Sequence, residues 1–490
     1  MFRKNYTVKI NLPGGIVAAG DLYAIVTAAE RARVSHMQLG TRQQLFCKVA
    51  DKYGPGFLQE LEQAGVSFEA NEERFPNIVS SYVTESIFTM QSWVSEGLYK
   101  DILDAFDYRP RLKINLVDRN QSLVPFFTGN INFISSDIGN YWYLYVRWPQ
   151  TTQLHAWKDL ICSQDIPRIS RHIEEMMPRK RIGDTEELYA TIQQSGPFAS
   201  IPVRSALQGT AFDLPYYEGF NRWGNKIWLG IYRREELFPL PFLKDICRIC
   251  LDTRIGQLYT TPWKSLIIKG IEDKEKVLWE YIMGKYRINL RHASNELNWQ
   301  VEDLNEDGLR LKRYLVRQLD LDDIRTEGLC FAIKTRPKTG LSGSVIIRKQ
   351  EEATTGQRKV LDRYDILHTP DFNANSKDYI LYREGVEKEN LPVYLVSLCK
   401  SFYEQQSRKE PAALRLSDRA VSDTAIAAGV RPVFQCRHCL TVYDEQYGDP
   451  AAGEPPGRPF AETSPDYACP VCGSDKADFG PVEKTTPIKG

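Results

Sequence analysis

Cys436-Arg-His-Cys439 and Cys469-Pro-Val-Cys472 are the stretches that decide the fold at the end of this chain. Each Cys-x-x-Cys loop supplies two sulfurs from one tight turn, and two such loops facing each other complete a tetrahedral set of thiolate ligands. Zinc and iron are both compatible with that geometry. Because four protein ligands leave no open position on the metal, the pattern predicts a metal centre that binds no substrate.

The residues around the two loops resemble rubredoxin, a small one-iron protein. The resemblance implies a single iron held by Cys436, Cys439, Cys469 and Cys472, which carries one electron at a time between its ferric and ferrous forms. Five aromatic residues are expected to form a core that lowers the polarity around the sulfurs, although plain core packing explains them equally. They are Phe434, Tyr443, Phe460, Tyr467 and Phe479, and the other matching residues are Asp444, Tyr447, Gly448, Asp449, Pro450, Gly453, Pro456, Gly457, Pro465, Asp466, Gly473 and Lys476.

A zinc ribbon is the alternative to the iron site. Its second Cys-x-x-Cys pair usually follows the first after roughly 15–20 residues, whereas here a Gly-Asp-Pro turn and a Pro-Gly turn come between the pairs. This later second pair favours iron.

One departure from rubredoxin is Leu440, which stands where that family usually has glycine. A non-glycine residue with positive φ there costs on the order of 1 kcal/mol.

The composition excludes several classes of function for the rest of the 490 residues. Acidic and basic residues balance at 63 each, so no global field favours nucleic acid or an anionic membrane surface. No uninterrupted apolar run is long enough to span a bilayer, and the first residues alternate like a strand rather than like a signal peptide. We expect a cytoplasmic protein whose other cysteines are reduced and unpaired. They are Cys47, Cys162, Cys247, Cys250, Cys330 and Cys399.

An internal repeat organises the long N-terminal part of the chain. In each copy a helix, a strand and a second helix follow one another, with a constant offset between the copies. The elements are a helix opening at Gly20, a strand over 37–49 and a helix around Leu58, and then a helix opening at Phe242, a strand over 258–269 and a helix around Trp279. The register places Cys247 and Cys250 on the apolar face of a helix, which predicts packing rather than a redox or metal pair.

These repeated units resemble the half-domains of the nitrite and sulfite reductase superfamily, which are sirohaem enzymes built from two pseudo-symmetric halves. The resemblance is carried by Gly40-Thr41-Arg42-Gln43, Thr261-Pro262-Trp263-Lys264, Pro110-Arg111-Leu112-Lys113-Ile114-Asn115 and the stretches 129–133, 141–146, 364–366 and 379–382. It implies an α+β fold with a pseudo-twofold body, followed by a small rubredoxin fold. The expected divisions are ferredoxin-like half-domains over 1–80 and 201–290, sirohaem-type α+β units over 81–200 and 291–406, a linker over 407–431 and a rubredoxin-like domain over 432–482.

The resemblance also implies a role for Arg42, Arg111 and Lys113. These residues alternate on expected strands, so their heads should project from one face, where they can bind carboxylates or oxyanions. By resemblance they would meet sirohaem carboxylates or the substrate anion. Considered without the resemblance, they are explained as solvated strand charges.

The body lacks the cysteines of the four-iron cluster that accompanies sirohaem in that superfamily. The stretches 117–124, 296–314 and 332–344 contain no cysteine, and Cys330 and Cys399 stand alone. The Arg-Asn pair that helps to hold sirohaem is replaced by Pro76-Asn77, with Arg74 nearby. We therefore expect no [4Fe–4S] cluster.

The sequence favours an electron carrier over an enzyme, with no catalytic residue assigned. In this interpretation the cluster-less body docks a redox protein, either a reductase or a terminal oxidoreductase, and the linker lets the iron domain sample docked and undocked positions. No nucleic acid or membrane partner is expected. The alternative is a nitrite or sulfite reductase in which the body binds sirohaem or another tetrapyrrole and the fused rubredoxin replaces the cluster. A third class is a zinc-stabilised interaction protein with no redox role.

Overall fold

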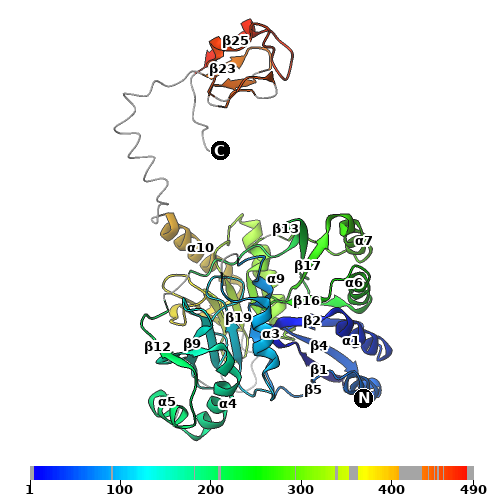
Figure 1. Ribbon diagram of the computed structural model, residues 1–490, viewed down its shortest axis with the longest axis vertical. Coiled ribbons are helices and arrows are strands. Elements are labelled where there is room, and N and C mark those ends of the chain that lie inside the picture. The colour runs from blue at the N-terminus through cyan, green and yellow to red at the C-terminus, as the bar shows by residue number, and fades with distance from the viewer. Residues whose placement is uncertain are drawn as a thin grey trace. The chain divides into compact units, whose positions relative to one another are not determined.

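The chain forms two compact units, Met1–Phe402 and Tyr403–Gly490, which are described separately below. We call the first unit the body (Figure 1). Beyond Ser407, the expected linker over 407–431 lies outside the described residues. The computed structural model describes residues 5–89, 92–149, 151–180, 183–207, 211–292, 294–336, 340–351, 362–407, 433–439, 441–445, 447–449, 452–455 and 457–482.

Two similar α+β halves form one side of the body. The first sheet has the strand order β15-β3-β4-β1-β5, and the second has the order β13-β14-β17-β16-β2. The elements of the first half are β1 (Asn5–Asn11), β2 (Ile16–Ala18), α1 (Ala19–Arg31), β3 (His36–Leu39), β4 (Gln44–Ala50), α2 (Gly54–Gln63) and β5 (Phe68–Ala70). Those of the second are β13 (Gly219–Trp223), β14 (Lys226–Ile231), β15 (Phe238–Pro239), α6 (Leu240–Asp252), β16 (Gln257–Thr260), β17 (Leu266–Glu272) and α7 (Lys276–Lys285).

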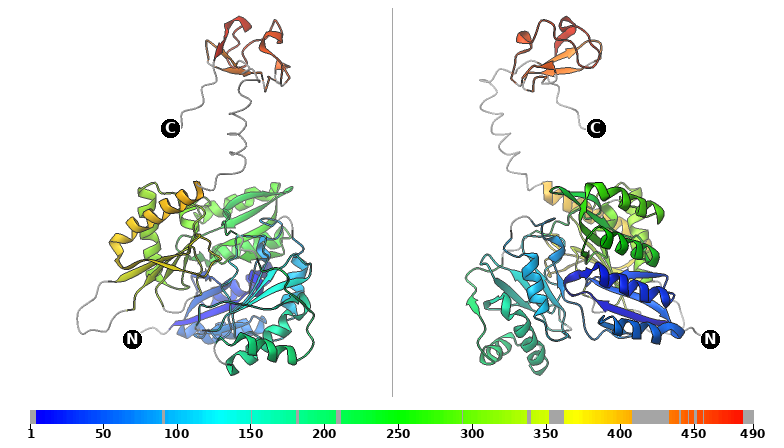
Figure 2. Two further views of the ribbon diagram at one scale, coloured as in Figure 1. Left: turned by 90° about the vertical axis from the view of Figure 1, so that its left-hand side faces the viewer. Right: turned by 45° about the vertical axis from the view of Figure 1, so that its right-hand side comes forward.

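The two halves exchange an edge strand. Strand β2 precedes α1 but pairs with β16 of the second sheet, where Ala18 lies opposite Gln257. Strand β15 precedes α6 but pairs with β3 of the first sheet, where Pro239 lies opposite His36. Helices α1 and α6 pack against each other, and one apolar core runs through both halves (Figure 2). The halves are therefore related by a pseudo-twofold axis, as the sequence predicts.

The periodicity of the sequence explains the two central helices. In α1, Leu22, Ile25, Val26 and Ala29 recur at helical spacing and are buried. In α6 the same face carries Leu243, Ile246, Cys247 and Cys250, which are also buried. The expectation that Cys247 and Cys250 are packing residues is consistent with this burial. All six body cysteines are buried and unpaired.

Each repeat contains a hairpin where the sequence suggested one long strand. A turn at residues 40–43 separates β3 from β4, and a turn at 261–265 separates β16 from β17. Gln43 and Lys264 adopt left-handed conformations in these turns, with φ of 58° and 55°. Mainly polar residues occupy both turns, and the expected strands 37–49 and 258–269 are wrong in their continuity.

Two larger mixed sheets complete the body. In each, three parallel strands are followed by antiparallel ones, in the orders β6-β7-β8-β9-β11-β12 and β18-β19-β20-β21-β22. The first unit comprises β6 (Val79–Ser80), α3 (Glu96–Asp104), β7 (Ile114–Val117), β8 (Ile131–Ser135), β9 (Tyr141–Val146), β10 (His155–Ala156), β11 (Asp159–Cys162), α4 (Ile166–Met176), α5 (Thr185–Gln194) and β12 (Ser200–Pro202). The second comprises α8 (Ser294–Leu297), β18 (Trp299–Val301), α9 (Glu306–Leu321), β19 (Phe331–Lys334), β20 (Val345–Lys349), β21 (Arg363–His368), β22 (Ile380–Glu387) and α10 (Leu391–Ser407).

The C-terminal domain is a small three-stranded sheet with long loops. Its strands, in the order β24-β23-β25, are β23 (Val433–Cys436), β24 (Val442–Asp444) and β25 (Phe479–Val482). This part of the chain and the pseudo-symmetric body together give the mixed α and β fold expected from the sequence.

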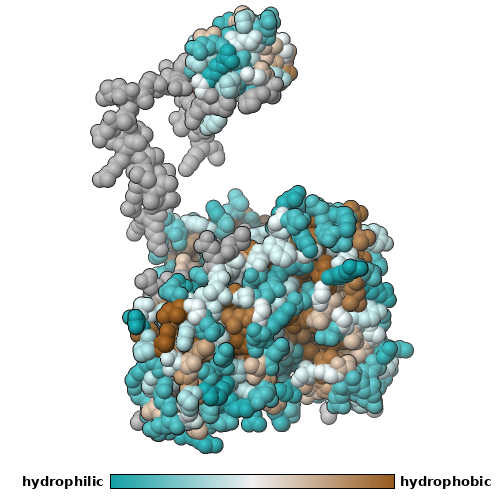
Figure 3. Space-filling view, in the orientation of Figure 1, coloured by the Kyte–Doolittle hydropathy of each residue, from teal (hydrophilic) through white to brown (hydrophobic). Residues whose placement is uncertain are grey.

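The visible face of the body is mostly hydrophilic, with apolar residues gathered in separate patches (Figure 3). Within the described residues, we find no helix with the length and apolar character needed to cross a membrane.

Candidate metal centre and basic cleft

Four cysteine sulfurs meet in the C-terminal domain. The Sγ atoms of Cys436, Cys439, Cys469 and Cys472 all lie within 4.8 Å of one another. Cys436 Sγ is 3.7 Å from Cys472 Sγ, and Cys439 Sγ is 3.4 Å from Cys469 Sγ. A tetrahedral site with metal–sulfur bonds of about 2.3 Å separates its sulfurs by about 3.8 Å. This sulfur cage therefore has the size that one tetrahedral metal ion needs.

The two loops bury one sulfur of each pair and leave the other towards solvent. Cys436 and Cys469 are buried, whereas Cys439 is half-buried and Cys472 is exposed. In the second loop Gly473 has φ of 71° and its N–H donates to Cys469 O at 2.8 Å, which closes the turn. Leu440, the corresponding residue of the first loop, lies outside the described residues.

Backbone N–H groups stabilise the thiolate form of the two inner cysteines, Cys436 and Cys469. The N–H groups of Cys439 and His438 lower the pKa of the Cys436 thiol. Burial opposes ionisation of Cys469, but the N–H groups of Cys472 and Val471 outweigh it and lower the pKa of that thiol to about 6. Because only the thiolate binds a metal, these main-chain contacts favour metal uptake at neutral pH.

An aromatic core lies beside the cage, as the sequence suggests. Phe434 and Phe460 stack with ring centroids 4.4 Å apart, and Phe460 also contacts Tyr443, Tyr467 and Phe479. The sulfurs of Cys436 and Cys469 belong to the same buried cluster. This packing excludes water from the inner side of the cage.

A basic cleft lies in the body between the first half and the two larger sheets. It consists of two hollows of about 440 and 550 Å³ that share Lys113, Asn130, Pro149, Gly340 and Leu341. The basic residues that line it are Lys9, Arg42, Arg74, Arg111, Lys113, Arg147, Lys334, Arg336, Arg348 and Lys377. The acidic ones are Glu73, Glu302 and Asp303.

The three basic residues singled out from the sequence all line this cleft, but not from strands as expected. Arg42 lies in the β3–β4 turn, and Arg111 and Lys113 lie just before β7. The guanidinium of Arg42 is buried and donates to Asn77 O at 2.7 Å, Ile114 O at 2.9 Å and Asn115 Oδ1 at 3.2 Å. Arg42 therefore ties three segments together, and most of its hydrogen-bonding capacity is used within the protein.

Four cations line the same hollow of the cleft: Lys113, Arg147, Lys334 and Lys377. Within the described residues, none of them forms an ion pair with a carboxylate. Burial and the neighbouring arginines Arg42 and Arg147 lower the pKa of Lys113 to about 8. Burial, Arg147 and Arg348 lower the pKa of Lys334 to about 8, and the pKa of Lys377 lies well below its usual value, mainly because of burial. Such a cluster is stabilised by a bound anion.

Side-chain hydrogen bonds connect 296–314 and 332–344, two of the stretches in which the sequence lacks cluster cysteines. Glu302 accepts hydrogen bonds from Thr335 Oγ1 at 2.6 Å, Arg336 N at 3.0 Å and Asn305 Nδ2 at 2.7 Å. These contacts join the segment after β18 to the segment after β19. In this place the protein uses a hydrogen-bonded network to hold two loops together.

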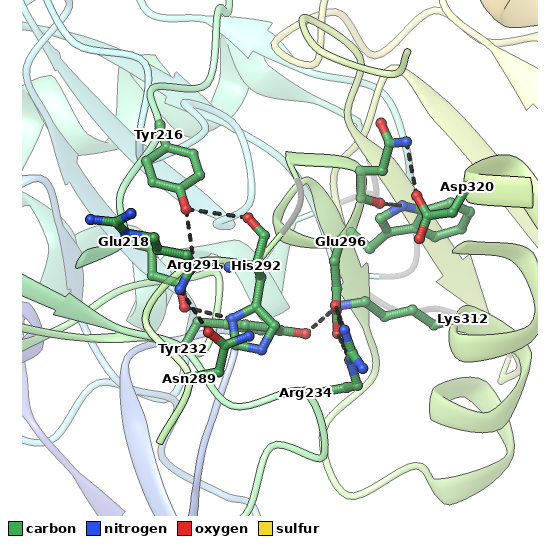
Figure 4. Close-up of polar contacts among 12 residues, drawn as sticks. Tyr216, Glu218, Tyr232, Arg234, Asn289, Arg291, His292, Glu296, Lys312 and Asp320 are labelled. Carbon is green, nitrogen blue, oxygen red and sulfur yellow. Dashed lines mark hydrogen bonds and ion pairs between the residues drawn. The ribbon is translucent and has the colours of Figure 1, made fainter. Parts of the chain in front are cut away.

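A second polar network, which the sequence did not indicate, joins the second half to α8 and α9 (Figure 4). Glu218 accepts the backbone N–H of His292 at 2.8 Å and lies 2.6 Å from His292 Nδ1. Arg234 forms a bidentate pair with Glu296, and Lys312 Nζ donates to Tyr232 at 2.7 Å. The polar groups of these residues bond to one another, so we assign the network a structural role.

Comparison with known proteins identifies the C-terminal domain. A sequence model of the rubredoxin family matches residues 433–479. Rubredoxin-2 of Rhodococcus erythropolis is 41% identical over 63 residues, which are 13% of this chain and 95% of that protein. The chain belongs to the rubredoxin family through this domain. The high molecular weight rubredoxin of Moorella thermoacetica is 44% identical over 61 residues, 12% of this chain, and the match spans 25% of its length.

The part of the chain before the rubredoxin domain has a different relative. The structure of the Mycobacterium tuberculosis NirA protein superposes with a TM-score of 0.64 and covers 84% of each chain, at 14% sequence identity. At that identity the likeness concerns the fold alone. The chain therefore shares the fold of the NirA protein over most of its length, in agreement with the mixed α and β fold expected from the sequence.

Proposed function

We propose that this protein transfers electrons through one iron held by Cys436, Cys439, Cys469 and Cys472. The observation that supports this most directly is the match between the sulfur spacings and a single tetrahedral ion, within a rubredoxin domain. When bound, iron in such a cage supplies a one-electron couple. All four positions of the ion are filled by the protein, so the domain exchanges electrons without binding a substrate.

The buried and the exposed sides of the cage have different roles in electron exchange. Main-chain N–H groups and the aromatic core enclose Cys436 and Cys469, which keeps water from the inner sulfurs. Cys439 and Cys472 face outwards, so a partner approaching that side comes nearest to the metal. We infer that electrons enter and leave through this edge.

For the body we infer a docking role. The cysteine-free stretches and the hydrogen-bonded network of Glu302 support a body without a [4Fe–4S] cluster. Its partner would be a redox protein, either a reductase or a terminal oxidoreductase, in the reducing environment of the cytoplasm. No part of this role requires nucleic acid or a membrane.

Elemental analysis and an absorption spectrum of the purified full-length protein test the iron site. We expect about one iron per chain and thiolate-to-iron charge-transfer bands in the visible region, with a reversible one-electron couple in voltammetry. The C469S variant, which removes one ligand from the cage, should lose the bands and the couple. Stoichiometric zinc in protein produced with ample iron would overturn the proposal in favour of a zinc-stabilised interaction protein.

The second candidate is a tetrapyrrole-binding nitrite or sulfite reductase whose fused rubredoxin replaces the iron–sulfur cluster. The cations Lys113, Arg147, Lys334 and Lys377 favour it, because guanidinium and ammonium groups suit a ligand with several carboxylates. Arg111, at the rim, would add a further contact. Sirohaem, when bound, would supply an iron centre at which a small anion could be reduced.

Expression with a supply of sirohaem separates the two candidates. A Soret band that co-purifies with the protein, together with nitrite- or sulfite-dependent turnover, would favour the reductase. In that case the K334M and K377M variants should bind the tetrapyrrole at least tenfold more weakly than the R109M variant, which changes a residue stacked on Phe75. Protein that stays free of tetrapyrrole under these conditions would remove this candidate and leave the docking role.

A further inference from the structure

Both metal-binding loops carry a hydroxyl residue at the same position, two residues after their second cysteine. Thr441 Oγ1 lies 3.0 Å from Cys439 Sγ, and Ser474 Oγ lies 2.9 Å from Cys472 Sγ. The two hydroxyls therefore make the same contact with the second sulfur of their own loops.

The backbone holds each hydroxyl residue in place. Cys436 N donates to Thr441 O at 2.8 Å, and Cys469 N donates to Ser474 O at 2.8 Å. Each residue thus accepts from the first cysteine of its loop and contacts the second. Because these main-chain bonds fix the residue, its side chain starts close to the sulfur and loses little freedom on forming the contact.

Main-chain N–H groups reach both inner and outer sulfurs, since Thr441 N–H also donates to Cys439, but the side-chain hydroxyls contact the outer sulfurs. The inner sulfurs of Cys436 and Cys469 receive main-chain N–H groups, which any side-chain sequence would provide. The outer sulfurs of Cys439 and Cys472 are the less buried ones, and both receive a side-chain hydroxyl. The identity of residues 441 and 474 therefore changes the surroundings of the outer sulfurs alone.

The direction of these hydrogen bonds follows from the ligand chemistry. A thiolate bound to a metal has no S–H proton, so the hydroxyl must be the donor and the sulfur the acceptor. One electron delivered by a reduced redox protein adds one negative charge to the four-thiolate site, and no bond is formed or broken. A donor aimed at sulfur stabilises the more negative state more strongly.

We propose that the hydroxyls of Thr441 and Ser474 raise the reduction potential of the rubredoxin centre by donating to its two outer sulfurs. This inference rests on the proposed iron site. It assigns the two side chains a tuning role that is separate from building the cage, and it applies to the edge where Cys439 and Cys472 approach a partner.

The test is voltammetry of the iron-loaded full-length protein with T441V, S474A and the double variant. We expect each single variant to shift the reduction equilibrium towards the oxidised form by threefold or more, and the double variant to shift it further. A tenfold change corresponds to about 59 mV for a one-electron couple. The charge-transfer bands should move as well, because the energy of the sulfur lone pairs changes.

Two further variants separate tuning from a structural role. T441S keeps the hydroxyl and should restore the wild-type potential. T463V removes a buried hydroxyl of the same domain that donates to Phe460 O at 2.9 Å and contacts no sulfur, so it should lower stability and leave the potential unchanged.

Three outcomes would overturn the inference. They are an unchanged potential in both T441V and S474A, an equal shift in T463V, and the failure of either variant to take up iron, since a hydroxyl needed to assemble the cage is not a tuning group. A wild-type protein with no reversible couple would instead contradict the proposed function itself. The two failures are therefore distinguishable in one set of measurements.

Discussion

Gln43 and Lys264 occupy the same position in the two halves of the body, and both have a left-handed backbone conformation, with φ of 58° and 55°. Their side chains nevertheless do different things. Gln43 Nε2 donates to Ser80 O at 3.0 Å and Thr260 O at 2.9 Å, which joins the halves through neutral contacts. Lys264 Nζ binds Glu236 Oε2 at 2.6 Å and lies 3.5 Å from Asp303 Oδ1. The pseudo-twofold axis thus relates backbone geometry but not charge.

The K264M variant should strongly destabilise the body. The side chains of Lys264 and Glu236 are only 4% and 8% exposed, and burial alone would lower the pKa of Lys264, but the two carboxylates raise it. Removing the cation leaves buried carboxylates unpaired, which costs about 3–5 kcal/mol. Urea unfolding followed by tryptophan fluorescence measures the loss.

The matched control for K264M is K274M, which breaks the exposed pair of Lys274 with Glu272. Its unfolding midpoint should stay close to that of the wild type, because exposed pairs contribute little. Equal midpoints for K264M and K274M would show that the buried cation is dispensable.

Stability should depend on pH through the cations of the cleft. The pKa values of Lys113 and Lys334 are about 8 in the folded protein, below the ordinary lysine value of 10.5. Between these values the unfolded chain binds more protons than the folded one, so this contribution to stability rises as pH increases from 8 towards 10.5. Below pH 8 both states are protonated, and the cost of the buried charges is fully present.

Comparing the wild type with the K113M/K334M variant isolates this contribution from other titrating groups. The midpoint of urea unfolding should rise more in the wild type than in the variant between pH 7.5 and 9.5. Parallel changes in the two proteins would contradict the depressed pKa values.

The sequence predicts some parts of this molecule well because they depend on local patterns. The ligands of the cage come in two pairs with fixed spacing, so Cys436, Cys439, Cys469 and Cys472 could be named before their geometry was known. Helices α1 and α6 could also be predicted, because apolar residues recur at helical spacing in the sequence. Their constant offset then revealed the pseudo-symmetric body.

Other parts depend on contacts between distant segments and were missed. Arg147, Lys334 and Lys377 come from separate segments of the two larger sheets, and only the tertiary fold brings them together. Glutamine is not a residue type that indicates a left-handed backbone, so the turn at Gln43 was not predicted. Arg42 was predicted to bind an anion, but the hydrogen bonds that occupy its guanidinium within the protein were not foreseeable.

Thiol labelling should distinguish the rubredoxin cysteines from those of the body. Burial raises the pKa of Cys47, Cys247 and Cys399 to about 12, so these thiols are almost entirely protonated at neutral pH and shielded from reagents. In folded metal-free protein, Cys472 should react first, because it is exposed. Mass spectrometry after brief exposure to iodoacetamide locates the modified residues.

Metal loading provides the control for this experiment. Protein with a filled cage should show almost no labelling until a denaturant is added, when all ten cysteines become reactive. Early modification of Cys247 or Cys250 in the folded protein would contradict their assignment as packing residues.

The E218A variant should loosen the network of Figure 4. The side chain of Glu218 is fully buried, and it accepts from His292 N at 2.8 Å and from Tyr216 at 3.2 Å. Its removal leaves buried donors without an acceptor, which costs about 2 kcal/mol or more. The urea midpoint of the body should fall accordingly. The Y216F variant removes only the longer contact, so it should lower the free energy of unfolding by about 1 kcal/mol or less. A larger loss of stability in Y216F than in E218A would contradict this prediction.

The reciprocal edge strands β2 and β15 make each half dependent on the other for a complete sheet. A fragment ending between the halves would leave β3 without its neighbour β15 and would release β2 with unsatisfied main-chain donors, an arrangement prone to aggregation. The halves therefore have to be synthesised and folded as one polypeptide.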